Sequence, residues 1–349
     1  MPSVRIIGSD ALSHRIFLEH LYHHMLSRLD FGPVFLDRIL PSLPLRLFTN
    51  RLFPLGTPHS REISFCRLCY NIRAARSPRC DIELFHTQQI AGGALHSREV
   101  VVVSLDTTGI QVEEMIRRRH DRWLFQLERA ILNRADLVVT WSQWAADSAI
   151  RDYGVAPSKT TVVRNGVVSS EVHAHVGGGG WLFVGNDFRR KGGDILVEVH
   201  QKYFRTRPLT VVTSSAIAGK IRGENLRVMH DVPRQRLLAE IYPRADLFVF
   251  PTREDYSPWV ITEALWSGLP VISTRVGAIP EMVRHGLEGW LLDRVDADLL
   301  AAALAEAQDP GLLHRAGRAA RRRAEEQHAL DCNLDRLCDR LAGYKDRHG

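Results

Sequence analysis

The chain has 349 residues, 45% of them hydrophobic and 25% charged, which suits a folded protein of two domains and excludes a disordered or fibrous one. Its five cysteines, an odd number, argue against a secreted disulfide framework, and no apolar run reaches the roughly eighteen residues that a membrane span needs. The net charge of +6 lies mostly in residues 1–165, where the aromatic residues show no stacking pattern among the basic ones, so nucleic-acid binding is not expected.

Short β-branched segments alternate with amphipathic segments along the first half of the chain. This alternation predicts a parallel α/β layer. We expect strands at Val4–Ile7, Asp81–Phe85, Glu99–Leu105, Asp136–Thr140 and Thr160–Arg164. We expect helices at His14–Leu29, Val112–Asn133 and Gln143–Tyr153. The segment 31–58 is rich in Pro and Leu and stays unassigned.

A glycine run, SSEVHAHVGGGG (Ser169–Gly180), interrupts the alternation and is interpreted as a flexible joint. It divides an N-terminal domain, 1–170, from a C-terminal domain, 171–349, and leaves open that the last helix packs back on the first domain. Further strands are expected at Trp181–Gly185, Leu209–Thr213, Asp246–Phe250, Pro270–Ser273 and Gly289–Leu292. Two doubly wound, Rossmann-like α/β domains facing a cleft would bind ligands at the carboxyl ends of their strands.

The most informative stretch runs from Phe248 to Val283. After its first strand and a polar loop, Ser257 suits a helix N-cap, Pro258 the first helical position and Gly268 the C-terminal cap. The start of that helix carries unpaired N–H groups and about half a positive charge, so the sequence predicts a phosphate site there.

Acidic and basic side chains flank this predicted phosphate site. Asp255 and Glu263 suit the hydroxyl groups of a sugar or ribose. A second stretch, WLFVGNDFRRKGGD (Trp181–Asp194), combines a strand, a glycine turn and three consecutive cations, of which Lys191 can neutralise a diphosphate. The two stretches together indicate a site for a sugar-linked diphosphate.

The first stretch resembles the C-terminal signature of the retaining GT-B glycosyltransferases of family 4, and WLFVGNDFRRKGGD resembles the entry of that family's second domain. The matching residues of the signature are Pro251-Thr252, Asp255, Glu263-Ala264, Gly268, Pro270-Val271, Gly277 and Pro280-Glu281. The resemblance implies that Asp255, or Glu254 immediately before it, hydrogen-bonds the donor sugar and that Glu263 holds the ribose. Backbone groups near Pro258 and Trp259 would contact the sugar or diphosphate.

The cations of the second stretch take their roles from the same resemblance. Lys191 matches the family lysine that grips the diphosphate. Asn186 stands where the family often has Arg, so that role passes to Arg190 or Arg189.

The first half adds phrases similar to a bacterial subgroup of this family. They are LFHTQQIA (Leu84–Ala91), VVVSLDTTGIQ (Val101–Gln111) and VVTWSQWAADSAIRDYGV (Val138–Val155). His86 and Asp106 are the polar residues expected nearest the reacting sugar. Many relatives have His where Asp106 stands, so this position departs from the family pattern.

The resemblance implies an enzyme that moves a hexose from a nucleotide-diphosphate sugar, with retention, to an acceptor glycan, lipid or small molecule. No cofactor and no metal are expected, because cations and a helix start replace a divalent ion and Asp296-Ala-Asp298 suits a helix cap better than a metal motif. The N-terminus shows no signal peptide, so a cytoplasmic protein is expected, with contact at the inner membrane face left open. The alternatives are a non-catalytic protein that binds a nucleotide-sugar or serves as a scaffold, and another GT-B class such as a phosphorylase or epimerase.

Overall fold

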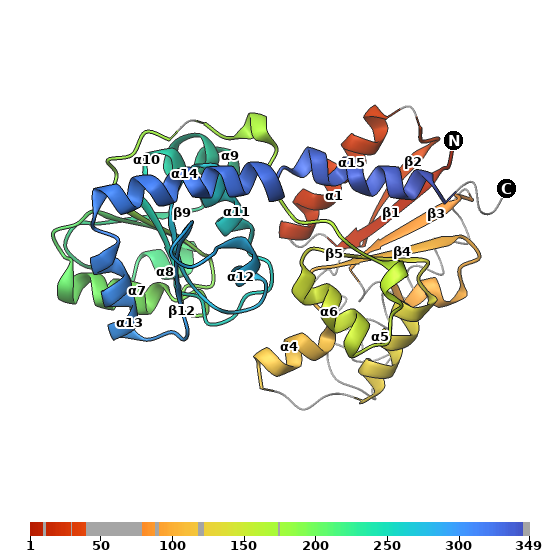
Figure 1. Cartoon of the computed structure of the whole chain (residues 1–349), viewed down its shortest axis with the longest axis horizontal. Coiled ribbons are helices and arrows are strands. Elements are labelled where there is room, and N and C mark those ends of the chain that lie inside the picture. Colours follow the sequence, from red (N-terminus) through yellow and green to blue (C-terminus); the bar gives the residue numbers. More distant parts are fainter. Residues whose placement is uncertain are drawn as a thin grey trace. The chain divides into compact units, whose positions relative to one another are not determined.

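A computed structural model describes residues 1–9, 12–28, 30–39, 79–87, 91–117, 122–173 and 175–344. The chain divides into two compact units (Figure 1). The first unit comprises Met1–Val163 together with Cys332–Gly349, and the second comprises Arg164–Asp331. In the described ranges, no helix is both long and apolar enough to cross a membrane.

The first unit is built on a six-stranded sheet in which all neighbouring strands are parallel. Its strands are β1 (Val4–Ser9), β2 (Val34–Ile39), β3 (Ile82–His86), β4 (Val100–Leu105), β5 (Leu137–Thr140) and β6 (Thr160–Val162), in the order β2-β1-β3-β4-β5-β6. The inner strands β3, β4 and β5 are almost wholly buried, as expected for parallel strands with both faces covered.

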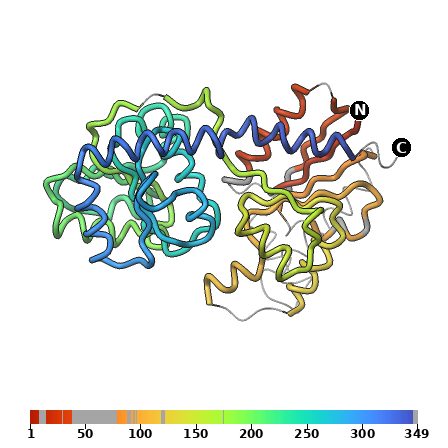
Figure 2. Tube along the Cα trace, viewed as in Figure 1, coloured from red at the N-terminus to blue at the C-terminus, as the bar shows by residue number. Residues whose placement is uncertain are grey.

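Helices cover the sheet of the first unit. They are α1 (Leu12–Ser27), α4 (Gly109–Met115), α5 (Arg122–Arg134), α6 (Gln143–Arg151) and α15 (Leu330–Ala342), with short 3-10 turns at Ala91–His96 and Pro157–Lys159. The later part of α15 lies along α1, so the last described residues return to the first strands (Figure 2). His24 Nε2 lies 3.0 Å from Asp335 Oδ1, and Arg28 Nη2 donates to Asp339 Oδ1 at 2.7 Å.

The second unit has its own six-stranded parallel sheet. Its strands are β7 (Trp181–Val184), β8 (Leu209–Thr213), β9 (Leu226–His230), β10 (Leu247–Phe250), β11 (Val271–Thr274) and β12 (Gly289–Leu292), in the order β12-β11-β10-β7-β8-β9. The strand order reverses between β7 and β10. In a doubly wound sheet, that reversal opens a crevice at the carboxyl ends of the two strands.

The helices of the second unit are mostly short. They are α7 (Gly193–Tyr203), α8 (Ser215–Ala218), α9 (Arg234–Arg236), the π-helical turn Leu237–Ile241, α10 (Tyr242–Arg244), α11 (Trp259–Trp266), α12 (Ile279–Met282), α13 (Ala297–Glu306) and α14 (Pro310–Gln327), after a 3-10 turn at Ser169–Glu171. Helix α11 is buried along nearly its whole length, against β11 and α14. Asp296 caps α13 through the amides of Asp298 and Leu299, which confirms its interpretation as a cap.

Two doubly wound α/β units confirm the predicted fold class, and every predicted strand is found within two residues of its expected bounds. Two strands were missed, β2 and β9. Both are edge strands with mixed sequences, VFLDRI and LRVMH, whose partial exposure removes the continuous apolar run of an inner strand. The predicted helix Val112–Asn133 is wrong as one helix, because Arg117 has φ +52°, outside the helical region, and two helices form instead.

The glycine run is not the free joint that its composition predicts. Gly178 and Gly180 donate their amides to the carboxylate of Asp246 at 2.6 and 2.9 Å, and Gly179 donates to the carbonyl of Arg244 at 2.8 Å. These bonds fix the run on the strand β10 side of the second unit. The division between the units by contacts lies earlier, between Val163 and Arg164.

Other expectations fall partly outside the described residues. Residues 88–90 of the LFHTQQIA phrase lie there, as do two of the five cysteines, Cys66 and Cys69. Cys80, Cys332 and Cys338, which are described, are free thiols.

His328 provides a pH-dependent contribution to the stability of the second unit. Its ring is 2% exposed and lies 2.9 Å from the carbonyl of Asn165, and burial lowers the pKa of His328 to about 4. A histidine whose pKa is lower in the folded protein stabilises the fold fully at pH values above its unfolded-state pKa of about 6.5. That stabilisation is lost as the pH falls toward 4. We expect wild type to lose about 3 kcal/mol more than His328→Gln between pH 6.5 and 4, measured by urea unfolding. The exposed His314→Gln is the control, and a wild-type loss equal to that of His328→Gln would contradict the assignment.

Candidate functional site

Two loops meet at the reversal of strand order in the second unit. One follows β7 and spans residues 185–192, and the other follows β10 and spans residues 251–258. The carbonyl of Arg190 accepts from the amide of Arg253 at 2.8 Å and from Thr252 Oγ1 at 3.3 Å. Arg190 Nη1 donates back to the carbonyl of Glu254 at 2.8 Å. These bonds hold the cationic loop against the acidic loop.

Lys191 and Asp255 form a close ion pair in this pair of loops. The two side chains are only 16% and 12% exposed, and Lys191 Nζ lies 5.5 Å from the centre of the Phe250 ring. Burial lowers the pKa of Lys191, and the charge of Asp255 opposes that shift. A poorly hydrated ammonium paired with the Asp255 carboxylate is well placed to exchange that partner for a phosphate oxygen.

Further polar groups surround the ion pair. Arg190 Nε donates to Asp187 at 2.8 Å, and this guanidinium lowers the pKa of the Asp187 carboxyl. Asn186 is exposed on the same loop. The side chain of Glu254 is half-buried, while its backbone carbonyl accepts from Arg190 and Thr252. The structure thus places Asp255 beside Lys191, and the choice of Asp255 over Glu254 as the first acid of the signature stays a prediction.

The start of α11 differs slightly from the expected cap. Helix α11 begins at Trp259, so Pro258 is the N-cap, and Ser257 precedes it rather than capping it. Proline has no side-chain acceptor, and no side chain caps this helix start. Asn165 Nδ2 donates to the carbonyl of Ser257 at 2.9 Å and fixes the approach to the helix. The C-cap is Ser267, and Gly268, predicted as the cap, follows it with φ +72°.

Glu263 lies one turn into α11 and is 4% exposed. Its carboxylate accepts from Arg234 Nε at 2.8 Å and from the hydroxyl of Tyr242 at 3.0 Å. Burial raises the pKa of Glu263, and Arg234 and Tyr242 oppose that shift. Arg234 also donates to Glu171 at 2.9 Å and lies 5.8 Å from the Trp259 ring. The predicted ribose contact of Glu263 stays a prediction, now with two protein partners on the carboxylate.

Arg234 and Tyr242 are site residues that sequence analysis missed. Arg234 opens a three-residue helix after the unpredicted strand β9, and nothing in DVPRQ marks it as a partner of an acid on α11. Only the folded sheet brings the two together. In the described ranges, no three His, Cys, Asp or Glu side chains gather as a metal site would require, and metal independence stays a prediction.

Gly192 allows the close approach of the two loops. It has φ +79°, and a Cβ there would lie 2.0 Å from the carbonyl oxygen of Pro251. We expect Gly192→Ala to destabilise the protein by about 1–3 kcal/mol, through the left-handed backbone and the clash with Pro251. Gly219→Ala is the matched control, because Gly219 has φ −64° and open space around its Cβ position. Equal thermal unfolding midpoints for the two variants would refute this role for Gly192.

In the first unit, His86 is the last residue of β3, and Asp106 comes directly after the neighbouring strand β4. The ring of His86 is fully buried, 3.0 Å from Ser104 Oγ, and stacks on Trp141 with 5.2 Å between ring centres. Asp106 follows β4 and is half-buried. The buried packing of His86 suits a residue that orders the strand ends. Catalytic roles for His86 and Asp106 stay predictions.

Family models match both halves of the chain. Residues 34–171 match "Glycosyltransferase Family 4", and residues 179–309 match "Glycosyl transferases group 1". One relative, the D-inositol 3-phosphate glycosyltransferase of Acidothermus cellulolyticus, is 27% identical over 63% of this chain. The match spans 55% of that relative's own length.

Solved structures share the fold over nearly the whole chain. Sucrose-phosphate synthase from Thermosynechococcus elongatus has a TM-score of 0.75 and 17% identity, covering 99% of this chain and all of that one. HepE of Anabaena, solved in complex with UDP and glucose, has a TM-score of 0.70 and 14% identity, covering 98% of this chain and all of that one. At these identities the likeness establishes the two-domain GT-B fold.

Proposed function

Because the chain belongs to the group 1, family 4 glycosyltransferases, we propose that it transfers a hexose from a nucleotide-diphosphate sugar to an acceptor hydroxyl, with retention of configuration. The observation that carries this proposal is the ion pair of Lys191 and Asp255 at the β7–β10 reversal, beside the uncapped start of α11. A partly buried cation and a helix start on one crevice suit a diphosphate.

The site residues of the second unit have separate roles in this proposal. The diphosphate takes Lys191 as its partner in place of Asp255, with Arg190 at the rim of the site. Asp255, released from Lys191, then accepts hydrogen bonds from the sugar hydroxyls. Glu263, one turn into α11 and oriented by Arg234, faces the ribose.

Charge accumulates on the diphosphate as the bond to the sugar breaks. Lys191 and the N–H groups at the start of α11 stabilise that charge without a metal ion, and the leaving phosphate guides the acceptor hydroxyl on the same face of the sugar. His86 and Asp106 are proposed for the acceptor side. The acceptor is a glycan, a lipid or a small molecule, and a lipid acceptor would bring the protein to the inner membrane face.

A two-step experiment tests the proposal. Thermal shift against UDP-, GDP- and ADP-hexoses identifies the donor, since a ligand at a hundred times its Kd stabilises by about 2.7 kcal/mol. Mass spectrometry then follows release of the nucleotide diphosphate with candidate acceptors, and NMR gives the anomeric configuration, each with and without EDTA. Donor binding without hydrolysis or transfer would support the non-catalytic alternative. An inverted product or EDTA-sensitive turnover would exclude the retaining or the metal-free part of the proposal.

A further inference from the structure

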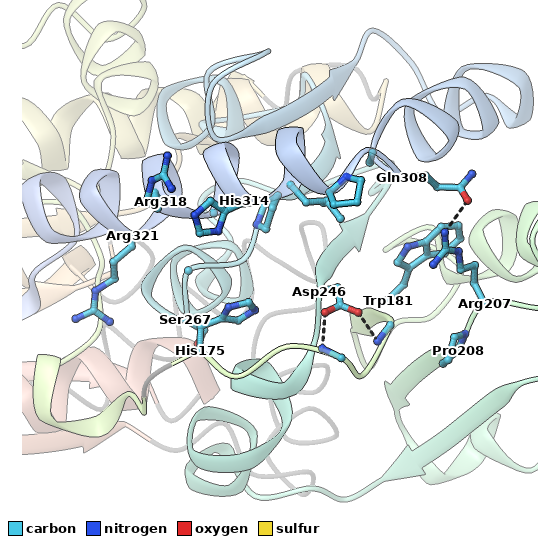
Figure 3. Close-up of a pocket in the computed structure, with 18 of the residues that line it drawn as sticks. His175, Trp181, Arg207, Pro208, Asp246, Ser267, Gln308, His314, Arg318 and Arg321 are labelled. Atoms are coloured by element: carbon cyan, nitrogen blue, oxygen red, sulfur yellow. Dashed lines mark hydrogen bonds between the residues drawn. The ribbon is translucent and has the colours of Figure 1, made fainter.

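A cavity lies in the second unit at the amino ends of the strands, whereas the Lys191 loops lie at the carboxyl ends. Its volume is about 890 Å³, and the described residues that line it all belong to this unit (Figure 3). The residues at or just before the amino ends of four strands line it: Trp181, Pro208, Asp246 and Pro270. Because β7 and β10 are four residues long, roughly 13 Å of strand separates this cavity from the loops at the carboxyl ends.

One face of α14 forms a wall of the cavity. His314, Gly317, Arg318 and Arg321 line it at helical spacings of three and four residues. Gly317 lets the helix approach, because a Cβ there would lie 2.6 Å from the carbonyl oxygen of Gly268. Figure 3 shows the side chains of His314 and Arg318 projecting from the same stretch of helix.

Positive charge dominates this lining. Asp246, the only carboxylate among the described residues that line the cavity, already accepts the amides of Gly178 and Gly180 (Figure 3). Arg321 stacks 4.7 Å from the Trp266 ring and donates to Glu325, and Arg207 donates to Gln308 at 3.0 Å. Over the described part of the chain, Arg318 and His314 have no hydrogen-bond or ion-pair partner, so both have unused donors at the cavity.

We propose that this cavity, here called the α14 pocket, binds a phosphate monoester of sugar size. An arginine fork matches phosphate oxygens in a bidentate way, and Arg318 and His314 present unused donors one turn apart. The volume lies within the range of small-molecule sites, and Trp181 and Pro208 provide an apolar surface for the carbon skeleton. This site goes beyond the proposed transfer reaction, because it lies at the opposite ends of the strands from the donor loops.

Isothermal titration calorimetry of the full chain tests the α14 pocket, with glucose 6-phosphate as the probe and glucose as its uncharged match, at fixed ionic strength. Wild type is expected to bind glucose 6-phosphate and not glucose. Arg318→Glu is expected to raise the Kd by about tenfold or more. The matched control is Arg322→Glu, since Arg322 is an exposed arginine one turn along α14 that does not line the pocket. It should change the Kd by less than about twofold.

Lys191→Ala separates this pocket from the donor site and is expected to leave glucose 6-phosphate binding in place. No binding by wild type, or equal binding of glucose, would overturn the proposal. So would equal weakening by Arg322→Glu, which would indicate general surface charge, or loss of binding in Lys191→Ala, which would place the ligand at the donor loops. Arg318 is exposed, so thermal unfolding of Arg318→Glu should match wild type and show that the variant is folded.

Discussion

Replacement of Lys191 by alanine is expected to lower kcat/KM by about 30- to 1,000-fold, which corresponds to about 2–4 kcal/mol of transition-state stabilisation. The Lys191 side chain is only 16% exposed and faces Asp255 at the β7–β10 reversal, so little water screens its charge. Charge develops on the leaving diphosphate, and kcat should therefore fall. A rise in KM alone would mean that Lys191 binds donor and transition state equally.

The control for this prediction is Lys202→Ala. Lys202 is an exposed lysine in the last turn of α7, outside the two loops of the site, so its loss should change kcat/KM by less than about twofold. Lys191→Arg keeps the charge but not the compact ammonium, and should fall between wild type and alanine. Wild-type kinetics in Lys191→Ala, with a donor confirmed to turn over, would remove the central residue of the proposed function.

The fold was largely predictable because each inner strand is a continuous buried run followed by a turn and an amphipathic helix. Leu247–Phe250 and Val100–Leu105 are examples, and their continuous apolar runs reflect burial on both faces of the sheet. Edge strands such as Leu226–His230 lack that pattern, because one side faces solvent and tolerates Arg and His. The prediction of a flexible joint at the glycine run was wrong for another reason. Its composition indicates flexibility, while the Asp246 carboxylate that fixes it lies 66 residues away along the chain.

The site was predictable where its residues are close in sequence. Asp255, Pro258 and Glu263 share one strand–loop–helix segment, and the ordered spacing of that segment carries the prediction. The contact of Lys191 with Asp255 joins two segments, and it follows from the reversal of strand order, which only the paired sheet reveals. Arg234 has no local signal at all, although it contacts Glu263 directly.

Arg234→Met is expected to destabilise the protein by about 3–5 kcal/mol near neutral pH, the cost of leaving a buried partner unpaired. Without the guanidinium, the carboxylate of Glu263 keeps only the Tyr242 hydroxyl in a site that is 4% exposed. Methionine fills much of the volume that the aliphatic part of the arginine side chain occupied, so the loss of the charge dominates the effect. Thermal unfolding by calorimetry measures it, and donor affinity should fall in parallel if Glu263 holds the ribose.

The pH dependence of this loss distinguishes the buried charge from lost packing. Burial already raises the pKa of Glu263, and removal of Arg234 raises it further. A carboxyl group whose pKa is higher in the folded protein stabilises the fold fully at pH values below its unfolded-state pKa, near 4.3. That stabilisation is lost as the pH rises through the folded-state pKa. The destabilisation of Arg234→Met should therefore be smaller at about pH 5 than at about pH 7.5.

The double variant Arg234→Met with Glu263→Gln removes the unpaired charge and should recover part of the stability with little pH dependence relative to wild type. The contribution of His328 is common to all of these proteins and cancels in the comparison. A double variant as unstable as the single one at both pH values would show that Arg234 acts by packing. In that case Glu263 would need no guanidinium to remain charged on α11, and its orientation toward the donor would rest on Tyr242 alone.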